Sequence, residues 1–499
     1  MRGKDVARLP GARAPTTRPV RCRRHFGHFI DDRAPVATGP AGFRAAHREI
    51  ECAASRHLIG LGRRRSISWP DSLPNGRAAP AAVLPRSAPV SRRDRPTFEA
   101  MTERLFINAR DAGGQPVNLV VRDGRFAAIG ADCTAAPGVQ TIDLDGRVVL
   151  PGFVDGHIHL DKSFVGDRWV PHEPVGSLRE RLAVEKRQLA AAPPIVERAN
   201  ALIAQAAAFG TIAMRSHVDV DATTGLSNLH AVMAAREQWR GIVDIELVAF
   251  PQAGVITCPG TAEILDAAVR EGADVVGGID PTTLDGDADG QLDIVFGIAE
   301  KRGAKIDIHL HEPGDTGIAQ LLRIAARTRA AGLGGRVNVS HAYALGQVSD
   351  DDVQRTAVAL AQAGVSILTN APGDCAFPPV QRLRDAGVHV FAGNDNIRDA
   401  WWPYGNGDML QRAMMVGYRS GFYTDEALGL ALDMATHAGA RAIGKENYGI
   451  AVGCDASFVA VRAPNAAAAV AGVPAERWVF RRGESDTGAP FAPSLRFMR

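Results

Sequence analysis

The segment Pro151-Gly-Phe-Val-Asp-Gly-His-Ile-His-Leu-Asp161 joins an apolar run to two histidines two positions apart. In an extended strand the side chains alternate between two faces, so Asp155, His157 and His159 are expected to share one face. Two imidazoles on one strand face can converge on a single metal ion. A lone His-x-His pair is weak evidence, because surface and core histidines outnumber ligands. The segment therefore predicts a strand that ends at a candidate metal site.

Further metal-type residues stand at the ends of three later apolar runs. They are His309, His341 and Asp395. Imidazoles and a carboxylate supplied by separate strands can hold one divalent ion and leave a position open for water. This distribution indicates a metal-dependent hydrolase rather than a set of structural histidines.

Strand candidates recur about every thirty residues after residue 150, with helix-period segments between them. The eight runs are Phe153–His159, Ile212–Val218, Asp244–Phe250, Asp274–Ile279, Lys305–Leu310, Val337–His341, Val365–Thr369 and Val388–Ala392. Strand and helix in alternation build a parallel sheet, and eight such units close into an α/β (β/α)₈ barrel. Catalytic residues of such barrels lie at the carboxyl ends of the strands, where all the metal-type residues fall.

The flanks of the barrel are rich in strand patterns. We expect residues 101–150 and 446–499 to form one small β-sandwich domain from both sides of a barrel at 151–445. Its strand candidates are Asn118–Arg122, Arg125–Ile129, Ala456–Arg462 and Trp478–Arg482. Between barrel and tail, Thr424–Ile443 is predicted to be helical, with Gly444 as its stop.

Residues 1–100 differ in composition from the rest of the chain. They hold 20 Lys plus Arg against 8 Asp plus Glu, whereas residues 101–499 hold 37 against 47. The segment has no sustained period, which predicts disorder rather than a packed core. A nucleic-acid or membrane tether and a targeting peptide are alternatives, but translated sequence upstream of a true start at Met101 is preferred. A chain starting at Met101 should therefore fold and retain activity.

The composition of the whole chain excludes several classes of protein. No apolar run in its 499 residues approaches the roughly 20 residues of a membrane span. Its six cysteines are scattered without a C-x-x-C pair, which suggests neither a disulfide framework nor a thiolate zinc site. We expect a cytoplasmic homo-oligomer whose folded body binds neither membrane nor nucleic acid.

The ordered motifs of residues 101–485 resemble the amidohydrolase superfamily, in the branch of cytosine deaminase and N-isopropylammelide isopropylaminohydrolase. The motifs that carry the resemblance are Leu150–Phe164, Arg215-Ser-His-Val-Asp219, Phe250-Pro-Gln252, Asp307-Ile-His-Leu-His-Glu312, Val339-Ser-His341 and Gly393-Asn-Asp-Asn396. Cytosine deaminase typically has a second aspartate where Asn396 stands. An amide both donates and accepts, so this exchange changes what can pair with a ring nitrogen.

The resemblance implies a role for each site residue. One divalent ion, Fe²⁺ or Zn²⁺, would be bound by His157, His159, His309 and Asp395. The catalytic groups would be Asp395, His341 as an acid/base beside the ion, and Glu312 as a proton shuttle. Substrate contacts would come from Gln252, Asn396, Trp401 and Lys162, although a solvated surface lysine is an equal alternative for Lys162. His217, His311 and His437 stay open between site and structural roles.

The predicted reaction is hydrolysis of an exocyclic C–N bond of a pyrimidine, triazine or similar nitrogen heterocycle, with release of ammonia or an amine. Relatives with two metals usually bridge them through a modified lysine at the end of strand four. Here that segment ends at Asp280 and contains no lysine, so one ion is expected. A cyclic amide or imide hydrolase and a non-catalytic barrel scaffold are the alternatives.

Overall fold

The computed structural model describes residues 103–485 apart from Asp374, and these residues belong to one compact unit. The predictions for residues 1–100, and for a start at Met101, lie outside the described residues. Within the described part of the chain, no helix is both long and apolar enough to cross a membrane.

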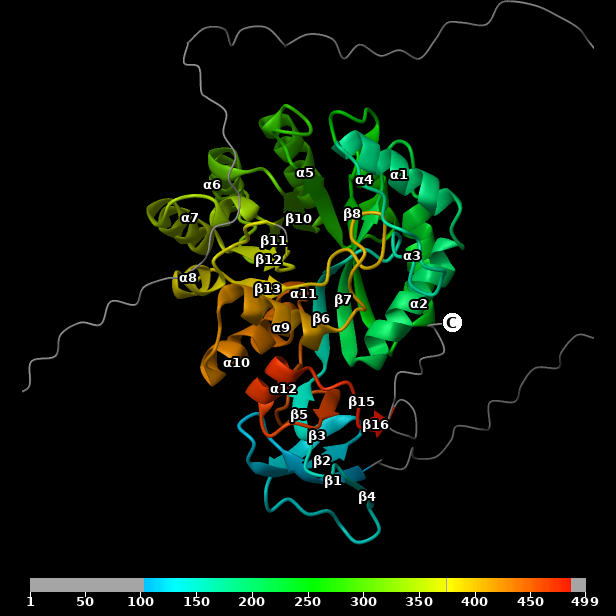
Figure 1. Ribbon diagram of the computed structural model, residues 1–499, viewed down its shortest axis with the longest axis vertical. Coiled ribbons are helices and arrows are strands. Elements are labelled where there is room, and N and C mark those ends of the chain that lie inside the picture. The colour runs from blue at the N-terminus through cyan, green and yellow to red at the C-terminus, as the bar shows by residue number, and fades with distance from the viewer. Residues whose placement is uncertain (1–102, 374, 486–499) are drawn as a thin grey trace, which may run out of the picture. The chain divides into compact units, whose positions relative to one another are not determined.

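Eight parallel strands form the barrel that the sequence predicts (Figure 1). They are β6 (Phe153–Ile158), β7 (Thr211–Asp219), β8 (Asp244–Phe250), β9 (Val275–Ile279), β10 (Lys305–Leu310), β11 (Val337–His341), β12 (Val365–Thr369) and β13 (Val390–Ala392). Each strand pairs with the next in chain order. A parallel bridge between Ile158 and Asp395 links the first strand to the segment after the last. The (β/α)₈ prediction is confirmed.

Apart from the last helix, which belongs to the C-terminal flank, the helices follow the strands around the outside of the barrel (Figure 1). They are α1 (Leu178–Ala190), α2 (Ile195–Ala208), α3 (Ser227–Gln238), α4 (Thr261–Glu271), α5 (Ala288–Arg302), α6 (Gly314–Ala330), α7 (Asp350–Ala363), α8 (Val380–Asp385), α9 (Met409–Ser420), α10 (Asp425–Met434), α11 (His437–Ile443) and α12 (Ala466–Gly472), besides a 3₁₀ turn at Tyr343–Gly346. Local sequence sets their ends. In α7, the Ser349 side chain accepts from Asp352 N at the start, and Gly364 is left-handed at the end.

The segment predicted as one helix over Thr424–Ile443 is two helices, α10 and α11. The break falls at Ala435 and Thr436, because the backbone N–H of Val154 in β6 donates to the carbonyl of Ala435 at 3.0 Å. The Ala435 carbonyl thus bonds to a barrel strand instead of continuing the helix. Gly444 ends α11 in the left-handed conformation, as expected.

The strands from both flanks form one separate sheet of eight strands, in the order β16-β15-β14-β5-β1-β2-β3 with β4 beside β1. Their bounds are β1 (Glu103–Arg110), β2 (Pro116–Arg122), β3 (Arg125–Gly130), β4 (Gln140–Asp143), β5 (Val148–Pro151), β14 (Phe458–Val461), β15 (Arg477–Arg481) and β16 (Glu484–Ser485). Antiparallel pairing of β14 with β5 joins the segments that precede and follow the barrel. Phe106, Phe458 and Phe480 pack within 5.2 Å of one another in its core. The predicted assembly from both flanks is therefore observed.

Gly393, between β13 and Asp395, is a position where the barrel tolerates no side chain. A Cβ there would lie 2.5 Å from the backbone nitrogen of His157 and 2.6 Å from its Cβ. Because backbone cannot move aside cheaply, Gly393→Ala should lower the free energy of unfolding by about 1–3 kcal/mol or more. Urea denaturation measures this.

The matched control is Gly297→Ala in α5, where an added Cβ meets nothing within 4 Å. Alanine in a helix interior should raise stability there by roughly 0.5–1 kcal/mol. Equal effects of the two substitutions would contradict the close approach of Gly393 to His157.

Candidate metal centre and substrate cavity

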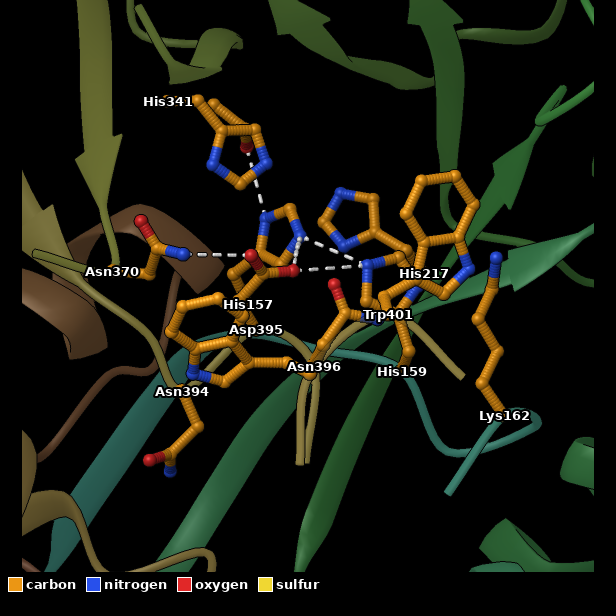
Figure 2. A network of polar contacts seen from close by, with 12 residues as sticks. His157, His159, Lys162, His217, His341, Asn370, Asn394, Asp395, Asn396 and Trp401 are labelled. Carbon is orange, nitrogen blue, oxygen red and sulfur yellow. Dashed lines mark hydrogen bonds and ion pairs between the residues drawn. The ribbon is translucent and has the colours of Figure 1, made fainter. Parts of the chain in front are cut away.

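The end of β6 and the segment after β13 bring three predicted ligands together. His157 Nε2 and His159 Nε2 are 3.3 Å apart, and Asp395 Oδ1 lies 3.4 and 3.2 Å from them. Figure 2 shows the three side chains directed toward one another. Bonds of ~2.0–2.1 Å in a tetrahedron place ligand atoms about 3.3 Å apart. The spacing therefore fits a single divalent ion.

His309, at the end of β10, is the fourth predicted ligand. Its ring centroid lies 4.7 Å from that of His157, and both of its ring nitrogens are buried without a hydrogen-bond partner among the described residues. Donor atoms of His157, His309 and His341 lie within 4.8 Å of one another. A buried imidazole with neither nitrogen satisfied is costly unless it binds a cation. Because His309 also lines the same cavity as His159 and Asp395, its orphaned nitrogens favour a metal-ligand role.

Burial keeps the imidazoles of His159 and His309 neutral. It lowers the pKa of His159 to about 4 and the pKa of His309 well below its usual value. Neutral imidazole is the form that binds a metal ion. These two side chains can therefore bind a cation at neutral pH without first losing a proton.

A chain of polar contacts behind the cluster fixes the tautomer of His157. The hydroxyl of Ser340 donates to Asp307 Oδ1 at 2.7 Å, so its oxygen accepts from His157 Nδ1 at 3.0 Å. Nε2 of His157 is then left with its lone pair toward the cluster. On the other side, Asn370 Nδ2 donates to Asp395 Oδ2 at 2.7 Å, as Figure 2 shows. Asn370 was not predicted from sequence.

His341 ends β11 in a strained conformation beside the cluster. Its φ is 74°, a region that non-glycine residues rarely adopt. Asp395 has a φ of 62° at the equivalent place after β13. His341 lines the main cavity, its Nδ1 lies 3.2 Å from the Tyr343 hydroxyl, and burial lowers its pKa well below the usual value. A neutral imidazole in this place can accept a proton.

His217, left open by the sequence, lies behind His157. Its ring stacks on that of His157 at 3.8 Å, and its Nε2 is 3.6 Å from Asp307 Oδ1. The side chain is fully buried. These contacts place it among the groups that support His157 rather than in the cavity wall.

Glu312 is not among the residues that line the cavity, although it directly follows His311, which does. Its Oε1 accepts from the backbone nitrogens of Thr282 and Thr283, both at 2.6 Å, while Oε2 is buried with no partner in the described structure. His311 lines the cavity instead, with Nδ1 2.8 Å from Asp280 Oδ2. Burial alone would lower the pKa of His311, but the Asp280 carboxylate outweighs it and raises the pKa. The alternation His309-Leu-His311, which repeats His157-Ile-His159, was the available sequence signal for His311.

Three of the four substrate contacts expected from the sequence line the cavity, and the fourth does not. Gln252, Asn396 and Trp401 line the main cavity, whose volume is about 920 Å³, together with His159, His309 and Asp395. Lys162 does not line it and is 1% exposed. Asn396 Nδ2 donates to Asp399 Oδ2 at 2.6 Å, and burial raises the pKa of Asp399 to about 7.

A (β/α)₈ barrel with imidazoles and a carboxylate converging at the carboxyl ends of its strands has the architecture of the barrel hydrolases. The particular family is shown by the sequence. The profile of the amidohydrolase family matches residues 140–477, and the chain belongs to this family. It is a hydrolase acting on carbon–nitrogen bonds other than peptide bonds.

Known proteins with similar sequence and structure support this assignment. N-isopropylammelide isopropyl amidohydrolase of Pseudomonas sp. (strain ADP) is 34% identical over 328 residues, which cover 64% of this chain and 80% of the relative. The crystal structure of N-isopropylammelide isopropylaminohydrolase from Burkholderia multivorans ATCC 17616 is 38% identical with a TM-score of 0.75, covering 78% of this chain and 100% of that chain. That of 5-methylcytosine deaminase from Klebsiella pneumoniae with 5-fluorocytosine is 28% identical with a TM-score of 0.68, covering 77% and 97%. The resemblance seen in the motifs is confirmed.

Proposed function

We propose that the protein hydrolyses an exocyclic C–N bond of a pyrimidine, triazine or similar nitrogen heterocycle and releases ammonia or an amine. The observation that carries this proposal is one cavity that joins the histidine–carboxylate cluster to two amides and an indole, those of Gln252, Asn396 and Trp401. An indole stacks on a flat ring, and amides pair with ring nitrogens and carbonyl oxygens. The names of the relatives, which act on N-isopropylammelide and 5-methylcytosine, support the same class of substrate.

The proposed metal ligands are His157, His159, His309 and Asp395, holding one Fe²⁺ or Zn²⁺. Bound there, such an ion would lower the pKa of water toward about 7 and make a nucleophile available at neutral pH. The chain itself supplies the proton transfers. His341, at the cavity wall, would accept and return a proton, and Glu312 would carry one to the leaving nitrogen.

The proposal has two further parts. The β9 strand is followed by Asp280, so the chain offers no lysine there to bridge a second ion, and a single ion is proposed. We also propose a homo-oligomer in the cytoplasm, with no nucleic-acid partner for the folded body.

An assay of amine and ammonia release tests the function. The purified protein, loaded separately with Fe²⁺ and Zn²⁺, would be given N-isopropylammelide, cytosine, 5-methylcytosine, isocytosine, creatinine and aminotriazines. We expect turnover of one oxo-substituted member with release of its exocyclic amine. Silence across the panel with metal bound would contradict the proposal.

Two controls separate the other functions. Cyclic amides and imides, such as dihydroorotate and hydantoin, belong in the same assay, because ring opening without amine release would show the alternative hydrolase. Metal per chain is measured in parallel, and a protein that binds no divalent ion would favour a scaffold.

A further inference from the structure

Lys162 lies behind the wall of the cavity and is surrounded by acceptor oxygens. Its Nζ is 2.5 Å from Gln252 Oε1, 3.0 Å from Asp219 Oδ1 and 3.3 Å from Glu185 Oε1. An ammonium group has three protons, and three oxygens surround it here. The ammonium group therefore has little hydrogen-bonding capacity left for a substrate.

The ammonium is held in place by buried acids. Glu185 and Asp219 are 3% and 7% exposed and come from α1 and from the end of β7. Burial by itself lowers the pKa of Lys162, but the carboxylates of Asp219 and Glu185 outweigh it and raise the pKa well above its usual value. Lys162 is therefore charged at neutral pH, directly behind the cavity wall.

This charge decides which way the amide of Gln252 points. An ammonium only donates hydrogen bonds, so the oxygen of Gln252 has to face Lys162. Gln252 lines the cavity, and with its oxygen turned to Lys162 its NH₂ group is the part of the amide that can donate to a bound ligand. Asn396 is held in the opposite sense, because its NH₂ donates to Asp399 Oδ2 at 2.6 Å and leaves its oxygen as the acceptor.

Glu185 extends the same network to the indole of the cavity. Trp401 Nε1 donates at 2.7 Å to Glu185 Oε1, the oxygen that also lies beside Lys162. The backbone nitrogen of Trp401 is held separately, 2.8 Å from Asp399 Oδ1. The Glu185 carboxylate thus links two walls of the cavity. Through Lys162 it connects to the Gln252 amide after β8, and it binds the Trp401 indole after β13 directly.

We propose that Lys162 and Glu185 are positioning residues that set substrate specificity: they fix Gln252 as a hydrogen-bond donor and hold the Trp401 indole beside it. This rests on the proposed function and narrows its substrate class. The preferred heterocycle carries an acceptor, a ring carbonyl oxygen or an unprotonated ring nitrogen, where it meets Gln252. A heterocycle with an amino group at that place is rejected, because its N–H groups meet the NH₂ group of Gln252 and neither side can accept a hydrogen bond.

A matched pair of substrates tests the proposal. Cytosine and 2,4-diaminopyrimidine differ by a carbonyl oxygen against an amino group, and each would be compared by kcat/KM and by calorimetric binding. Wild-type protein should prefer the oxo compound by about tenfold or more. In Lys162→Met the amide of Gln252 is free to turn over, so the preference should fall to within about threefold, with bound metal unchanged. Lys162→Arg, which keeps the charge and the donors, should retain most of the preference for the oxo compound.

Lys305→Met is the control for a merely structural effect. Lys305 lies at the start of β10, 2.6 Å from Glu246 Oε1, at the end of the barrel away from the cavity. Its loss should lower stability without changing the substrate ratio. Because Lys162→Met leaves two buried carboxylates without their cation, Lys162→Met combined with Asp219→Asn is the second variant if the first does not fold.

The outcomes distinguish this inference from the proposed function. Wild-type protein that neither binds nor turns over any heterocycle overturns the function and the inference together. An active wild type whose oxo preference survives in every folded Lys162→Met variant, or that prefers the amino compound, overturns the inference alone. An unchanged KM in a Glu185→Gln variant would contradict the positioning role of Glu185 and leave that of Lys162.

Discussion

Exchange of His309 for alanine should abolish stoichiometric metal binding and lower turnover by about 10³-fold or more. The physical reason is the environment of the ring, whose two nitrogens are buried next to His157 with no hydrogen-bond partner among residues 103–485 as described. Removing it deletes one ligand of the proposed four and opens the cluster to water. A divalent ion contributes several kcal/mol to the stabilisation of developing charge, which corresponds to about 10³-fold in rate. Mass spectrometry for bound metal and steady-state kinetics measure the two effects.

The control is His389→Ala, a histidine held by other contacts. His389 precedes β13 and contacts Ser366 Oγ at 3.1 Å through Nδ1 and the carbonyl of Ala438 at 3.0 Å through Nε2. Its removal should reduce stability by roughly 1–3 kcal/mol and leave the metal content unchanged. If His309→Ala kept a full equivalent of metal and a normal rate, the proposed ligand set would be wrong.

The barrel could be predicted from the sequence because its determinants are local. Each strand is a short apolar run, and residues such as Gly364 and Gly444 end helices by a backbone conformation that needs no tertiary information. Strand order then follows from the handedness of the crossovers. The positions of His157 and Asp395 at strand ends were readable for the same reason.

The partners of the site residues could not be predicted because they depend on packing between distant segments. The Lys162 charge was visible in the sequence, but not that Glu185, from a helix 23 positions further on, would lie beside it. The division of Thr424–Ile443 arises because β6 takes one helix carbonyl. Similarly, the motif around His309 indicated Glu312, but it could not show that the backbone amides of Thr282 and Thr283 in the β9–α5 loop would hold its carboxylate.

Glu312→Gln should reduce kcat by about 10²–10⁴-fold while the metal stays bound, since this is the usual contribution of a positioned proton carrier. The substitution is a clean test because of the contacts of Glu312. Its Oε1, which accepts from Thr282 N and Thr283 N, is retained in glutamine, whereas Oε2, which has no partner in the described part of the chain, becomes an NH₂ group. The loop therefore keeps its anchor and only the titratable proton is lost.

The matched variant is His311→Gln, which alters the other group able to carry this proton. His311 lines the cavity, stacks on His341 at 4.6 Å, and is oriented by Asp280. If Glu312 is the carrier, His311→Gln should cost much less in kcat than Glu312→Gln. A near-normal rate in Glu312→Gln with a collapse in His311→Gln would transfer the role to the His311–Asp280 pair. Such a result would make Glu312 the anchor of the β9–α5 loop, and proton transfer would then pass through His311, which follows β10 and lines the cavity.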